Sequence, residues 1–144
     1  MLYMEKIVKL TVNSNALNTY INFGSLNNVE QYKKAYICIE KFIAAHTGLD
    51  NDGLNLSIRD IKECYSKRPA DSFISPSSII DSYVGVPSPD NTARLYNTTN
   101  GIETWLEIPM NVLLNNLNII VSPFADVVLA DIYYTLSMKV KLTN

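Results

Sequence analysis

Charged side chains are scarce in this chain. Asp, Glu, Lys and Arg make up 18% of its 144 residues, against roughly 25% in an average soluble domain, and Asn, Ser and Thr take their place. A polar but weakly charged surface suits a protein that packs against copies of itself or against other proteins. A genome rich in A and T gives the same enrichment in Asn, Ile, Tyr and Lys, and composition does not separate the two causes.

The chain also lacks a basic patch and long apolar runs. Its formal net charge is −2, and no cationic cluster is longer than Lys33-Lys34 or Lys67-Arg68. Electrostatic capture of nucleic acid needs many cationic groups against phosphates, so we expect no direct nucleic-acid binding. No apolar run reaches the roughly 18 residues of a membrane-spanning helix, and the N-terminus has no signal-peptide pattern. We therefore expect neither a membrane span nor a leader.

Metal-binding residues are few. His46 is the only histidine, and a His followed by Thr-Gly is typical of a turn or of the surface. Cys38 and Cys64 lack the close spacing of a zinc site, and without a secretory leader free buried thiols are favoured over a disulfide. Asp50 and Asp52 lie in G-L-D-N-D-G, which lacks the closing Glu of a calcium loop and is typical of a turn.

No motif for catalysis is present. The chain has no glycine-rich nucleotide-binding pattern, no nucleophile elbow and no Cys/His pair. Glu103 and Glu107 could form a carboxylate pair, but glycosidic chemistry requires the two groups to face each other across a cleft. We therefore expect no enzymatic activity, no metal and no cofactor.

Residues 131–142 carry the clearest structural pattern. The sequence D-I-Y-Y-T-L-S-M-K-V-K-L alternates apolar and polar side chains, which predicts a strand with one buried and one solvated face. In this register Lys139 and Lys141 lie on the solvated face. Such alternation is typical of antiparallel sheets and argues against a parallel α/β fold.

Similar runs recur along the chain with turn signals between them. They predict strands at 5–12, 18–23, 35–42, from 54 toward 65, 79–86, 93–96, 102–108, 117–121 and 131–142, with turns at 48–53 and 97–101, a loop at 66–78 and a connector at 113–116. About eight or nine short strands indicate a sandwich or barrel, so we predict a single all-β domain over residues 1–144, an antiparallel β-sandwich.

An alternative assignment places helices at residues 29–45 and 109–117. The first contains good helix formers such as Glu30, Lys33 and Lys34. The residues that follow, Tyr36, Ile37 and others like them, are strand formers. We favour a strand there, with Ile37 and Ile39 on one face and Tyr36 and Cys38 on the other.

Aromatic residues are the candidates for binding. Trp105 is flanked by Glu103 and Glu107, and the three share one strand parity. A Trp beside carboxylates can stack a sugar or anchor a subunit contact, although packing in the core is as common. Tyr96 and Tyr83 are the further stacking candidates, because tyrosine suits surfaces buried on one side only.

The C-terminal half carries a family resemblance. The segments I-I-D-S-Y-V-G-V-P, L-Y-N-T-T-N-G-I-E-T-W-L-E-I-P, L-L-N-N-L-N-I-I-V-S and Y-T-L-S-M-K-V-K-L resemble, in order and spacing, the single jelly-roll minor capsid, penton and vertex proteins of double-stranded DNA viruses such as virophages, polinton-like and giant viruses. The resemblance covers residues 54–142. It implies an eight-stranded jelly roll and a non-enzymatic role in the virion.

That role would make the protein's partners itself, as a trimer or pentamer, and other capsid proteins. The alternative function is a carbohydrate- or receptor-binding module on the same sandwich, with Trp105, Tyr96 and Tyr83 as the stacking residues. The two can coexist, because a viral attachment protein does both.

Overall fold

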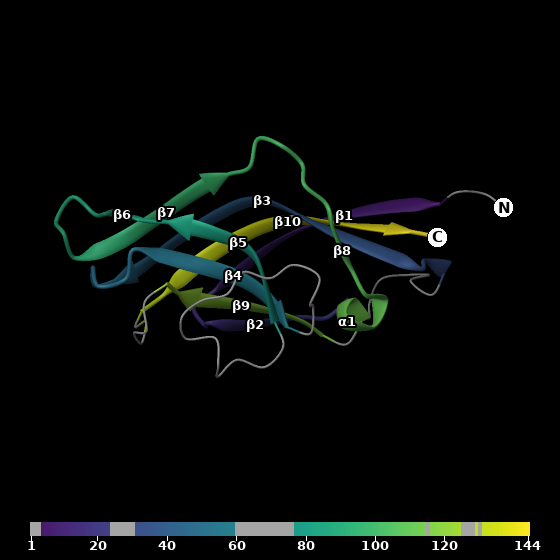
Figure 1. Ribbon diagram of the computed structural model, residues 1–144, viewed down its shortest axis with the longest axis horizontal. Helices are drawn as coiled ribbons and strands as arrows, with labels where there is room; N and C mark the ends of the chain where they lie inside the picture. The colour runs from purple at the N-terminus through teal and green to yellow at the C-terminus, as the bar shows by residue number, and fades with distance from the viewer. Residues whose placement is uncertain (1–3, 24–30, 60–76, 115, 125–128, 130) are drawn as a thin grey trace.

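A computed structural model describes residues 4–23, 31–59, 77–114, 116–124, 129 and 131–144 (Figure 1). These residues form an all-β antiparallel sandwich, as predicted. The elements are β1 (Glu5–Ser14), β2 (Asn18–Ile21), β3 (Lys34–Thr47), β4 (Gly53–Arg59), β5 (Ser77–Val84), β6 (Val86–Pro87), β7 (Ala93–Thr99), β8 (Leu106–Ile108), α1 (Met110–Leu114), β9 (Leu117–Pro123) and β10 (Tyr133–Thr143).

The strands form two sheets that face each other (Figure 1). The six-stranded sheet has the order β1-β10-β3-β7-β6. The sixth strand, β8, also pairs with β3, along a different stretch of it from β7. The four-stranded sheet has the order β2-β9-β4-β5. All these pairings are antiparallel.

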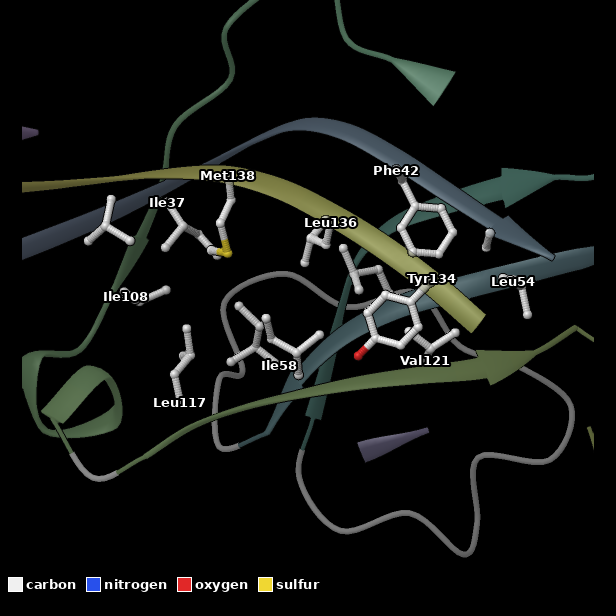
Figure 2. Packing of buried hydrophobic residues seen from close by; sticks show 14 of the residues in the cluster. Ile37, Phe42, Leu54, Ile58, Ile108, Leu117, Val121, Tyr134, Leu136 and Met138 are labelled. Atoms are coloured by element: carbon white, nitrogen blue, oxygen red, sulfur yellow. The ribbon is translucent and has the colours of Figure 1, made fainter. Parts of the chain in front are cut away.

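The core lies between the two layers, and the last strand supplies much of it. The predicted inward residues of this segment are buried: Ile132, Tyr134, Leu136, Met138, Val140 and Leu142. Three residues of β9 and three of β4 close the core from the other sheet: Leu117, Ile119 and Val121, and Leu54, Leu56 and Ile58. Figure 2 shows Leu117, Val121, Leu54 and Ile58 among them. Alternation along these strands thus places one apolar face of each sheet inside, as the sequence predicted.

A β-bulge in β3 changes which residues face the core. The register with β10 shifts between Ser137 and Met138, so that Ile39 lies opposite Met138 and Lys41 opposite Ser137. Glu40 is the extra residue, and a bulge of this kind reverses the alternation that follows it. Ile37 therefore faces inward before the bulge, and Phe42 after it.

Residues 34–47 form one continuous strand. The strand predicted at 35–42 is therefore confirmed, and the alternative helix at 29–45 is wrong over its described part. The connector predicted at 113–116 is right only at Asn116, which lies in a turn, because α1 occupies Met110–Leu114. The alternative helix at 109–117 is right in part. Pro109 directly precedes α1, and its carbonyl accepts hydrogen bonds from the N–H groups of Val112 and Leu113. Proline suits this position, because its fixed φ fits the first turn.

Further boundaries differ from prediction. The turn at 97–101 is wrong at its start, because β7 continues to Thr99, and the strand at 102–108 is reduced to β8. The strand predicted at 79–86 is divided into β5 and β6 around Gly85, where a Cβ atom would overlap the Tyr96 ring. The loop predicted at 66–78 is wrong at its end, because β5 begins at Ser77; the rest of that loop, and any continuation of β4 beyond Arg59 toward residue 65, lie outside the described residues. Cys38 is buried and free, and Cys64 lies outside them as well.

Candidate functional site

Two of the three candidate aromatic residues belong to the core. Tyr83 is 3% exposed and its ring stacks on Phe42, with ring centroids 4.3 Å apart and an interplanar angle of 12°. Tyr96 is 2% exposed, and its hydroxyl lies 2.8 Å from Nε2 of His46. The structure therefore corrects the expectation that these two rings are stacking surfaces: neither has a face open to a ligand outside the sandwich.

Burial controls the chemistry of both tyrosines. It raises the pKa of Tyr96 to about 12, because the charged phenolate is poorly solvated inside the sandwich. It raises the pKa of Tyr83 further, and the negative charge of Asp81 adds to the effect. Both hydroxyls stay protonated at neutral pH, so neither supplies a nucleophile or a base.

His46 is a strand residue of the core and not the turn or surface residue that the sequence predicted. It lies near the end of β3 and is 2% exposed. Its Nε2 meets the Tyr96 hydroxyl, and its Nδ1 lies 3.2 Å from the carbonyl oxygen of Thr47. Both ring nitrogens thus have partners, which is typical of a structural histidine.

A short segment, residues 100–105, crosses from β7 to β8, and we call it the strap. The two strands pair with successive stretches of β3, at Lys41–Thr47 and Ala35–Ile37. Between them the chain leaves the sheet, as Figure 1 shows for the green segment between the labels β7 and β8. Asn100 anchors the start of the strap, because its backbone N–H donates to the Glu40 carbonyl (2.8 Å) and its side-chain amide to the Ile39 carbonyl (2.7 Å). The strap therefore covers the bulge of β3 and satisfies its free carbonyl groups.

Trp105 ends the strap above two lysines of β10. The Nζ atom of Lys141 lies 4.3 Å from the Trp105 ring centroid, and that of Lys139 lies 5.5 Å from it. Lys141 also lies 5.1 Å from the centroid of the Tyr36 ring. These are cation–π distances, so the protein's own lysines occupy ring surface that a sugar would need for stacking.

Glu103 of the strap forms an ion pair with Lys139, and Glu40 lies 4.0 Å from the same ammonium group. The hydrogen bond and charge of Lys139 lower the pKa of Glu103, and Glu103 in turn raises the pKa of Lys139. Lys139 points to the outer face, as its predicted parity requires, but it is only 9% exposed, because the strap covers it. Glu107 lies on β8, opposite Tyr36, and the Tyr36 ring contacts Lys141 on the same outer face as Trp105. Glu103, Trp105 and Glu107 therefore share one face as predicted, although Glu103 and Trp105 belong to the strap and not to a strand.

Part of the remaining outer surface of the six-stranded sheet is uncharged. We call this part the uncharged half. It is formed by two neighbouring rows of outward-facing residues. One row runs across β6, β7, β3 and β10 and contains Val86, Leu95, Ala45 and Tyr133; the other runs across β7, β3, β10 and β1 and contains Asn97, Ile43, Thr135 and Asn13. Its edges are well exposed, at 61% for Val86 and 55% for Tyr133. Sequence analysis missed this surface, because the bulge places Ile43 and Ala45 on the opposite face from Ile37 and Ile39.

Metal clusters and membrane-spanning helices are absent from the part of the chain that the structure describes. Within it, no group of three or more His, Cys, Asp or Glu side chains is placed to hold a metal ion. Among the same residues, no helix has the length and apolar character needed to cross a membrane. Comparison with models of protein families gave no match, and comparison with curated proteins gave none either.

Proposed function

We propose that this protein is a non-enzymatic structural subunit of a double-stranded DNA virus particle, of the minor capsid, penton or spike type. It acts by self-association and by packing against other capsid proteins. Two observations support the proposal: the order of the strands, and the uncharged half of the outer face.

The strand order supports the jelly roll that the sequence resemblance implies. With the short strands β6 and β8 set aside, the other eight can be numbered in chain order. The sheets then have the orders 1-8-3-6 and 2-7-4-5. Two four-stranded antiparallel sheets that exchange strands in this way form the two Greek keys of a jelly roll. This architecture is common in capsid proteins, although it also occurs in lectins.

The uncharged half of the outer face is the observation that carries the function. It combines exposed apolar side chains (Val86, Leu95 and Ile43) with uncharged polar ones. A contiguous apolar patch with a polar rim marks a protein interface, and an interface without charges at its centre avoids the cost of burying them. Because such a surface carries no repulsive charge, it suits contact with a second copy of the chain.

A pair of variants tests this proposal. Val86→Lys places a charge in the uncharged half and should dissociate the oligomer, measured by sedimentation velocity. Val84→Lys is the matched control: Val84 is also exposed, but it adjoins the buried Tyr83 in β5 and faces away from the other sheet. Equal masses for Val86→Lys and the unmodified protein would contradict the proposed interface.

A further inference from the structure

We propose that a pocket at the open edge of the sandwich binds a small organic cation with an aliphatic chain. The pocket has a volume of about 480 Å³, within the range of roughly 300–1,000 Å³ that holds small molecules. It lies where the strap leaves the six-stranded sheet and where β5 forms the edge of the four-stranded sheet.

The walls of the pocket are apolar. Ile37 and Ile39 of β3 contribute inward-facing side chains, and Ile80 of β5 and Leu106 of β8 face them from the two edges. Ile37 belongs to the buried core, and the other three pack against it. The pocket thus reaches the core, where an aliphatic chain would lose contact with water, and this burial of apolar surface favours binding.

One carboxylate decides the charge that the pocket accepts. Asp81 is the only charged residue among the described residues that line it. Asp81 lies opposite Leu56 of β4, whose side chain is fully buried, so it faces inward from an edge strand. Its Oδ1 accepts a hydrogen bond from the backbone N–H of Ser82, and within the described part of the chain no cation pairs with it.

A buried hydroxyl lies beside this carboxylate. Tyr83 has no hydrogen-bond partner for its Oη atom among the described residues. Burial raises the pKa of Tyr83, and the nearby Asp81 carboxylate adds to the effect. A primary ammonium group carries several donors, and it can therefore pair with the Asp81 carboxylate, which lines the pocket. A carboxylate in the same place would be repelled by Asp81.

Asp81 has an alternative role. Inward-pointing charges on edge strands protect a sheet against pairing with another chain. This alternative predicts that Asp81→Asn self-associates while the affinity for an amine is unchanged. The binding role predicts the reverse, so one variant separates the two.

The experiment compares three probes with the same chain and different heads: n-hexylamine, n-hexanol and n-hexanoate, at pH 7. Fluorescence of Trp105, the only tryptophan, reports occupancy, because its neighbours Thr104 and Leu106 line the pocket. We expect hexylamine to bind about tenfold more tightly than hexanol, because its ammonium group forms one charge pair with Asp81 near the protein surface. Hexanoate should bind least, because Asp81 repels its carboxylate.

Two variants complete the test. Asp81→Asn should reduce the affinity for hexylamine about tenfold and leave that for hexanol unchanged. Ile39→Phe fills the pocket and should abolish binding of both. If this variant fails to fold, Asp81→Asn, at a partly exposed position on an edge strand, still provides the test. Equal affinities for the three probes, no binding of hexylamine at millimolar concentration, or an unchanged amine affinity in Asp81→Asn would overturn the proposal.

Discussion

Phe42→Ala tests the bulge that sets the inner face of β3. Phe42 is fully buried and packs between two rings: Tyr83 at 4.3 Å and Tyr134 at 5.9 Å between centroids. Truncation of a buried Phe costs about 3–5 kcal/mol. We therefore expect Phe42→Ala to lower the free energy of unfolding by about 4 kcal/mol, and Tm by about 8–16 °C for a domain of this size. Urea unfolding followed by far-UV circular dichroism measures the first value, and a thermal scan the second.

The neighbouring residue supplies the control. Without the bulge, strict alternation from Ile37 and Ile39 would place Lys41 in the core and Phe42 outside. In the structure Lys41 is exposed, so Lys41→Ala should change the free energy of unfolding by no more than about 0.5 kcal/mol. A large loss of stability in Lys41→Ala together with a small one in Phe42→Ala would refute the assigned register.

Three further predictions concern other parts of the fold. Val140→Asp should abolish soluble folding, measured as the yield of soluble protein, because it buries an unpaired charge in the core. The raised pKa of Tyr96 contributes stability that is fully present below pH 10 and is lost as the pH rises toward 12. In thermal scans at increasing pH, the Tm of Tyr96→Phe should therefore fall less between pH 10 and 12 than the Tm of the unmodified protein. The pKa of Glu103 is lowered, so its ion pair with Lys139 is fully formed above pH 4.5 and weakens as the pH falls through the lowered pKa. Trp105 fluorescence should change in that acid range. In a Lys139→Met variant the fluorescence spectrum should already differ at neutral pH, and the change in acid should be absent.

Much of the fold could be predicted because period-two alternation is a local property. The last strand has an apolar residue at every second position, and each of these side chains is buried in the structure. The same reasoning placed β9, where Leu117, Ile119 and Val121 face the core. Alternation fails where the chain is irregular, and it gives no sign of a bulge such as that at Glu40.

The candidate site was harder to predict, because it depends on contacts between distant segments. Trp105 was a candidate for ligand binding, but its ring lies over two lysines of β10, and only the tertiary fold brings these residues together. Tyr83 and Tyr96 have the same local pattern as surface tyrosines, and their burial depends on the opposing sheet and on Gly85. Lys139 similarly looked solvated, because the strap that covers it leaves no trace in the sequence of β10.

The most direct test of the proposed function is the mass of the unmodified protein in solution, measured by light scattering after size exclusion over a range of concentrations. Self-association through the uncharged half predicts a closed trimer or pentamer, with the number separating a spike-type from a vertex-type subunit. A monomer at the highest concentration would contradict self-association and favour a binding module on the same sandwich.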